Sequence, residues 1–245
     1  MAGITAALAG SGDQPMASLR QAATNSRPMQ LSSRLELAQG GQIWEYFAPP
    51  GVCQSKLGGR NGSSACTVIA AKLSQLCLQG QLPHPTSGEE PSPSVINTFI
   101  SAIQEGNRLY DNKAKELGLL SVTNVLSVLP DLKLRPRRHC DFGFTTVEQA
   151  TQALEEVLKT ALQSPLPQSF LMDKTPYTVL VVCGGGKYML YDSHAHGSGK
   201  GLLMAVSSKL SVATDMAKYT ANFFLRQFGL TRRSLDFCGI ELLPE

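Results

Sequence analysis

Several signatures of membrane-spanning, secreted and disulfide-rich proteins are missing from this sequence of 245 residues. No stretch approaches the roughly 20 consecutive apolar residues that a membrane-spanning helix requires, so we expect no membrane segment. The six cysteines form no CxxC pair and no dense framework, and several lie within apolar runs, which favours reduced thiols. The N-terminus lacks the cationic and then apolar segments of a secretory signal. We therefore expect a cytoplasmic or nuclear protein.

A strong excess of one charge is also missing. The formal net charge is +3, and Lys, Arg, Asp and Glu are scattered along the chain. No basic patch with interleaved aromatic residues is present, so we expect no nucleic-acid partner. The densest basic run, Arg135-Pro136-Arg137-Arg138-His139, is interpreted as a solvated loop.

The sequence predicts one folded domain preceded by a tail. Residues 1–30 are rich in Ala, Gly, Ser, Gln and Asn without apolar periodicity, and we expect them to be flexible. Residues 31–245 are long enough for one domain with a substantial core. Apolar spacing predicts helices at 66–79, from Ser94, at 111–129, from the capping-box pair Thr145 and Glu148, and at 211–228. Folded structure is expected to begin near residues 42–47. Alternating patterns predict strands near 170–172, 177–183, 187–194, 202–206 and 235–243. Most helices precede the strands, which indicates an α+β fold with an antiparallel sheet.

Cys66 is the first candidate for chemistry, because it opens a predicted helix. At that position the free backbone N–H groups and the positive end of the helix dipole stabilise a thiolate. The preceding Gly62-Ser63-Ser64-Ala65 leaves room for a substrate backbone to approach. A small residue that merely starts a helix would look the same, so Cys66 alone does not indicate a nucleophile.

Asp192 and His194 form the second candidate group, at the end of a predicted hairpin strand. Residues two apart on a strand point to the same face, so the carboxylate can lie beside the imidazole. A carboxylate in that place fixes the tautomer of a general base and stabilises its protonated form. Gln54 lies twelve residues before Cys66 in a loop. Its side-chain amide is suited to donate a hydrogen bond to the oxyanion of an acyl-transfer intermediate.

The order of Gln54, Cys66 and then Asp192-Ser193-His194 on a late strand resembles the papain-like peptidases that cleave ubiquitin or ubiquitin-like modifiers. Within that group, the upstream Gln is most similar to the deubiquitinases of the herpesvirus large tegument protein type. The resemblance extends over roughly residues 42–196. Many of those enzymes have Pro between the Asp and the His, where this chain has Ser193.

This resemblance implies a papain-like cysteine protease fold, in which the helical part around the nucleophile helix packs on an antiparallel sheet that carries the Asp and the His. It implies Cys66 as the nucleophile, His194 as the base, Asp192 as its orienting carboxylate and Gln54 as the oxyanion donor. The implied activity is that of a deubiquitinase, a thiol isopeptidase acting after the C-terminal Gly of ubiquitin. Its partners would be ubiquitin or polyubiquitin chains, and it would need no cofactor and no metal.

Three alternatives stay open at this level. The substrate could be another ubiquitin-like modifier, or the chain could be a catalytically silent ubiquitin-binding module. A metal-dependent hydrolase could use Asp192, His194 and His196 as ligands, although the remaining histidines, His84 and His139, lie in predicted loops. In the cysteine-protease interpretation, His196 is expected to be a loop residue near the rim of the active site.

Overall fold

The computed structural model describes the residues from Arg34 onward, with short gaps. The predicted tail, residues 1–30, therefore lies outside the described residues. The described residues are 34–38, 43–143, 146–174, 176–197, 199–207, 212–228 and 235–244. No helix among them is both long and apolar enough to span a membrane.

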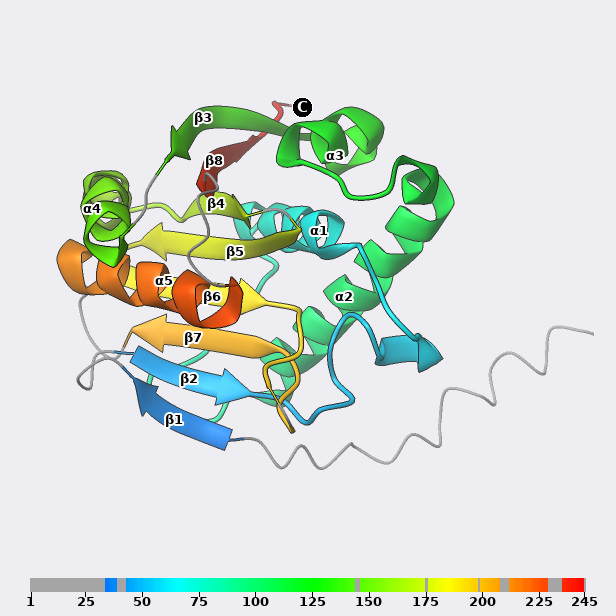
Figure 1. Ribbon diagram of the computed structural model, residues 1–245, viewed down its shortest axis with the longest axis horizontal. Helices are drawn as coiled ribbons and strands as arrows, with labels where there is room; N and C mark the ends of the chain where they lie inside the picture. The colour runs from blue at the N-terminus through cyan, green and yellow to red at the C-terminus, as the bar shows by residue number, and fades with distance from the viewer. Residues whose placement is uncertain are drawn as a thin grey trace, which may run out of the picture. The chain divides into compact units, whose positions relative to one another are not determined.

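An antiparallel sheet is the centre of the fold (Figure 1). Within the described residues it has eight strands in the order β1-β2-β7-β6-β5-β4-β8-β3. The strands are β1 (Arg34–Ala38), β2 (Ile43–Phe47), β3 (Leu134–Phe142), β4 (Gln168–Lys174), β5 (Tyr177–Gly184), β6 (Lys187–Asp192), β7 (Leu203–Ser207) and β8 (Leu235–Leu242). Each neighbouring pair is antiparallel. The α+β class is confirmed.

Helices cover both faces of the sheet. The helices are α1 (Cys66–Leu78), α2 (Pro93–Lys113), α3 (Val122–Val128), α4 (Val147–Gln163) and α5 (Ala213–Phe228), with short 3-10 turns η2 (Leu57–Gly59), η3 (Lys115–Leu117) and η4 (Pro130–Leu132). Figure 1 shows α4 and α5 across the near face, with α1 and α2 behind the sheet. The main apolar core lies between α4, α5 and the sheet residues that face them, such as Met172 and Val181. Because side chains alternate along a strand, the intervening residues face α1.

The helix that begins with Cys66 is buried along most of its length, because it lies between the sheet and α2. Gly106 of α2 permits this packing. A Cβ atom at that position would lie 2.6 Å from Cγ1 and 2.9 Å from Cα of Ile69. The two helices can therefore approach only because residue 106 has no side chain. The helix-on-sheet layout that the papain-like resemblance implied is present.

Several element boundaries differ from the sequence-based predictions. The helix predicted over 111–129 does not exist as one unit, because α2 continues to Lys113 and the chain then turns at Gly118, whose φ is +72°. A positive φ is incompatible with a continuing helix and is favoured by glycine. The predicted cap of α4 is wrong by one position. Thr146 is the N-cap residue, and its side chain accepts a hydrogen bond from the Gln149 N–H at 3.2 Å, whereas Thr145 lies outside the described residues.

The basic run Arg135–His139 is not a loop. It forms most of β3, the strand at one end of the sheet, and it pairs with β8. Proline and basic residues are typical of edge strands, because they oppose the addition of another strand. The run of basic residues therefore belongs to an exposed edge strand and not to a loop.

Candidate active site

Cys66 is the first residue of α1, as predicted. Its neighbour Ala65 is the N-cap residue and supplies no side-chain hydrogen bond to the helix end, so the first backbone N–H groups are not occupied by a capping side chain. The Cys66 side chain is nearly buried, and Sγ lies 3.3 Å from the carbonyl oxygen of Pro176, in the turn between β4 and β5. Cys66 also lines a cavity of about 190 Å³ together with Ser64, Asp173 and Pro176. The thiol is thus held at a positive helix end beside an open space.

Asp192 is the last residue of β6, and His194 follows just after the strand. Oδ1 of Asp192 lies 2.5 Å from Nδ1 of His194 and also accepts a hydrogen bond from the His194 backbone N–H at 3.0 Å. The carboxylate therefore fixes the ring orientation, as the Asp-x-His spacing indicated. The imidazole also forms a hydrogen bond with Cys66. Because Nδ1 faces Asp192, Nε2 is the ring nitrogen left for the thiol.

Electrostatics in this group favour a charged imidazole. Burial would lower the pKa of His194, but the charge of Asp192, the hydrogen bond with it and the contact with Cys66 outweigh burial and raise the pKa well above its ordinary value. Burial would likewise raise the pKa of Asp192, whereas its contacts with His194 and His196 lower the pKa below its ordinary range. The arrangement suits an imidazolium that can stabilise a thiolate.

His196 is not at the rim of the site. Its side chain is 3% exposed, and Nε2 lies 3.1 Å from Oδ2 of Asp192. The ring packs against Phe47 and Phe223, with centroid distances of 5.6 and 6.1 Å. The expectation of a rim residue was wrong, because these aromatic rings cover the imidazole. Asp192 is fully buried, and its two imidazole contacts offset the cost of removing its charge from water.

The metal alternative has no matching cluster in the part of the chain that the structure describes. No group of three or more His, Cys, Asp or Glu side chains there is arranged to hold a metal ion. Asp192 instead contacts each imidazole through a different oxygen. His139 lies on β3, 3.9 Å from Asp236, rather than in the predicted loop.

Gln54 lies next to the Asp-x-His segment and is 3% exposed. Its backbone N–H donates to the carbonyl of Ser193 at 2.8 Å, and its side-chain Oε1 accepts from the Ser193 hydroxyl at 2.6 Å. Nε2 donates to the carbonyl of Ser63 at 3.3 Å, three residues before Cys66. Asn107 of α2 completes this group, because it donates to the Gln54 carbonyl at 3.0 Å and accepts from the Ser63 hydroxyl at 2.7 Å. The amide nitrogen of Gln54 is thereby directed towards the loop that carries the nucleophile.

The structure thus brings together all four residues proposed from the sequence, and it adds Ser193 and His196. Alternation along a strand indicated the direction of the Ser193 side chain, because a residue between Asp192 and His194 points to the side opposite to theirs. No local pattern indicated that this opposite side faces Gln54, which lies 139 positions earlier in the chain.

The structure is similar in fold to several solved structures, among them a ubiquitin-specific protease and a cysteine protease-like domain. The Pseudomonas avirulence protein AvrPphB shares 12% sequence identity with a TM-score of 0.46, covering 73% of this chain and 92% of its own. The ubiquitin-specific protease of a murine cytomegalovirus tegument protein, solved with a ubiquitin-based suicide substrate, shares 15% identity with a TM-score of 0.49, covering 78% and 84%. PatoxP, a cysteine protease-like domain of a Photorhabdus asymbiotica toxin, shares 15% identity with a TM-score of 0.42, covering 79% of this chain and 52% of its own. No protein-family model and no curated sequence matches the chain.

Proposed function

We propose that the protein is a cysteine-type deubiquitinase, which hydrolyses the isopeptide bond after the C-terminal Gly of ubiquitin. The observation that carries the thiol chemistry is the chain of contacts from Cys66 through the imidazole of His194 to the buried carboxylate of Asp192. A cysteine held by a base that is itself held by a third group is the arrangement of an activated nucleophile.

In the first half of the reaction, the Cys66 thiolate attacks the isopeptide carbonyl and forms a carbon–sulfur bond. The oxyanion accepts hydrogen bonds from the Cys66 backbone N–H and from Nε2 of Gln54. This nitrogen carries two hydrogens, and only one is needed for the Ser63 carbonyl. His194 then gives its proton to the departing lysine amine, and a thioester between ubiquitin and Cys66 remains.

In the second half, water replaces the amine. His194, now neutral, accepts a proton from the water as its oxygen attacks the thioester carbonyl. The carbon–sulfur bond breaks, which restores the thiolate beside the imidazolium. Ubiquitin leaves with a C-terminal carboxylic acid, which gives its proton to solvent and becomes the carboxylate. Asp192 stays ionised throughout and keeps the ring in place.

The choice of ubiquitin rests on the resemblance of the Gln, Cys and Asp-x-His order to the tegument-type enzymes. The small residues Gly62, Ser63, Ser64 and Ala65 before the nucleophile are consistent with it, because a Gly-Gly tail needs a narrow passage and no side-chain pocket at its last two positions.

Covalent capture tests this proposal. Ubiquitin that carries a C-terminal electrophile should modify the wild-type protein, and Cys66→Ala should abolish the modification. Cys140→Ala is a matched control, because Cys140 is a partly exposed free cysteine outside the site, and it should be modified like the wild type. If a probe made from another ubiquitin-like modifier labels the protein and the ubiquitin probe does not, that modifier is the substrate instead of ubiquitin. Binding without any capture would refute the enzymatic assignment.

A further inference from the structure

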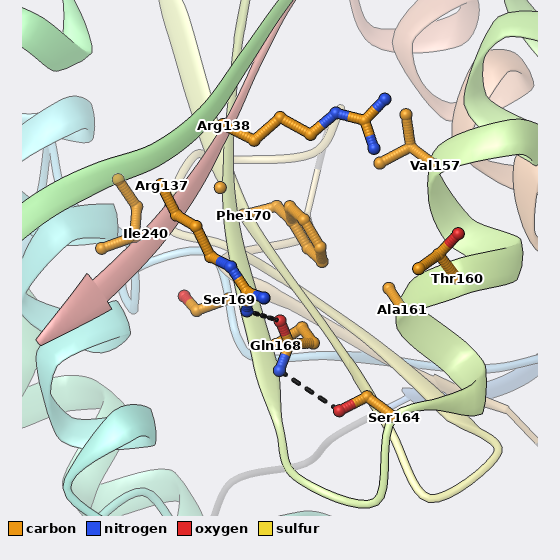
Figure 2. A pocket seen from close by; sticks show the side chains of 11 residues that line it. Arg137, Arg138, Val157, Thr160, Ala161, Ser164, Gln168, Ser169, Phe170 and Ile240 are labelled. Atoms are coloured by element: carbon orange, nitrogen blue, oxygen red, sulfur yellow. Dashed lines mark hydrogen bonds between the residues drawn. The ribbon is translucent and has the colours of Figure 1, made fainter.

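A second cavity, of about 200 Å³, lies away from the catalytic group, between α4 and the outer strands of the sheet (Figure 2). Its apolar wall includes Val157 and Ala161 of α4, Phe170 of β4 and Ile240 of β8. Two arginines of β3, Arg137 and Arg138, form its opposite side. No Asp or Glu is among the described residues that line this cavity, so its lining carries a positive charge.

Irregular pairing of β3 explains why both arginines line one cavity. Pro136 pairs with Ile240 and Arg138 pairs with Gly239, so two residues of β3 span a single step of β8, with Arg137 as the extra residue. Consecutive side chains of a regular strand point to opposite faces, whereas a bulge can turn both to the same side. Figure 2 shows Arg138 extending towards Val157 and Arg137 extending towards Gln168.

The cavity extends to the backbone of Gly239, because this residue has no side chain to fill the space. Arg138, Gly239 and Phe170 form one row across β3, β8 and β4. A Cβ at Gly239 would meet Phe170 at 3.5 Å and the Arg138 carbonyl at 3.6 Å, which are ordinary contacts, and its φ is not positive. The backbone therefore does not require glycine here. Its effect is to leave empty space between a guanidinium group and an aromatic ring.

Polar groups at the rim hold one arginine in place. Nη1 of Arg137 donates to Oε1 of Gln168 at 2.7 Å, and Nε2 of Gln168 donates to the Ser164 hydroxyl at 3.2 Å. A guanidinium group has five N–H donors, and this contact uses one of them. The remaining donors suit a planar or tetrahedral oxyanion, which arginine binds through paired hydrogen bonds.

We propose that this cavity binds a small aromatic phosphate or carboxylate, with its anionic group on Arg137 and Arg138 and its ring beside Phe170. A cavity of about 200 Å³ corresponds to roughly seven waters at ~30 Å³ each, which a single substituted ring can displace. An aromatic ring gains further from the offset or edge contact that Phe170 offers. This site is independent of the proposed function, because it shares no residue with the catalytic group.

Titration of the full chain with phenyl phosphate at constant ionic strength tests the site, with binding followed by calorimetry and by NMR shifts of the Gly239 and Phe170 amides. Arg138→Gln, Arg137→Gln and Gly239→Ala should each weaken binding at least tenfold, the last by filling the space that Gly239 leaves. Arg135→Gln is the matched control, because Arg135 lies on the same strand but pairs with Glu241 at 2.7 Å outside the cavity. It should change binding less than twofold.

Two comparison ligands separate the contributions. Inorganic phosphate, which lacks the ring, and phenol, which lacks the charge, should each bind at least tenfold more weakly than phenyl phosphate. Benzoate should bind and compete if a carboxylate is the natural anion, and its failure to compete would assign the site to phosphates. Equal weakening by Arg135→Gln and Arg138→Gln, or no shift at Gly239 and Phe170, would overturn the proposal.

Discussion

Replacement of Asp173 by asparagine should stabilise the protein above about pH 6. Asp173 of β4 is 6% exposed and lies at the end of a chain of contacts that begins beside the nucleophile. The Thr67 hydroxyl is 2.8 Å from the Leu120 carbonyl and 2.8 Å from the Thr178 hydroxyl, which is 3.1 Å from Oδ1 of Asp173. The Thr178 hydroxyl donates to this carboxylate oxygen, and the side-chain oxygen of an asparagine can accept the same hydrogen bond. Asp173→Asn therefore removes the buried charge at every pH and keeps the contact.

The expected magnitude follows from the pKa of Asp173. The net effect of its surroundings is to raise the pKa of Asp173 from 3.8 to about 6. Burial is the largest cause, the hydrogen bond from Thr178 lowers the pKa in part, and the charge of Asp236 raises it further. Because the folded state binds the proton more tightly, this contribution to stability is fully present below pH 3.8 and is lost as the pH rises through about 6. A pKa raised from 3.8 to about 6 corresponds to roughly 3 kcal/mol, which is the upper limit of the gain in unfolding free energy expected for Asp173→Asn at pH 8.

Equilibrium urea unfolding at several pH values between 4 and 8 measures this effect. The difference in unfolding free energy between Asp173→Asn and the wild type should be small at pH 4 and should grow to about 1–3 kcal/mol at pH 8. Asp131→Asn serves as a control, because Asp131 is exposed and paired with Lys113, and it should show no such gain. An Asp173→Asn variant that is no more stable than the wild type at pH 8 would refute the raised pKa of Asp173.

Three further predictions concern catalysis, measured with a fluorogenic ubiquitin substrate. Gln54→Ala should lower kcat about 10²-fold while circular dichroism shows a folded chain, and normal turnover would exclude Gln54 as an oxyanion donor. Ser193→Ala should lower kcat by up to about tenfold, because one hydrogen bond that orients Gln54 is lost, and Ser193→Thr should restore it; equal loss in both variants would indicate a steric role for Ser193. The alkaline limb of the pH profile of kcat/KM should lie well above pH 6.5, and Asp192→Asn should move it to lower pH, because the negative charge that raises the pKa of His194 is removed; an unmoved limb would show that His194 does not govern it.

Local sequence patterns were sufficient for those parts of the fold that depend on neighbours in the chain. The apolar spacing after Cys66 predicted α1 and its first residue, and the alternating patterns at 177–183 and 187–194 predicted the neighbouring strands β5 and β6. The Asp-x-His spacing predicted that the carboxylate and the imidazole are adjacent. Each of these features depends on contacts within a few residues, so short periodicities describe them.

Other features depend on contacts between distant segments, and no local pattern reports them. His196 is buried because the turn after β6 packs its ring between Phe47 and Phe223, and Ser193 orients Gln54 because their loops meet across the site. The basic run became an edge strand because β8, far later in the chain, supplies its hydrogen bonds. Burial and strand pairing are properties of the packed chain, and the sequence near a residue does not specify which distant segment will cover it.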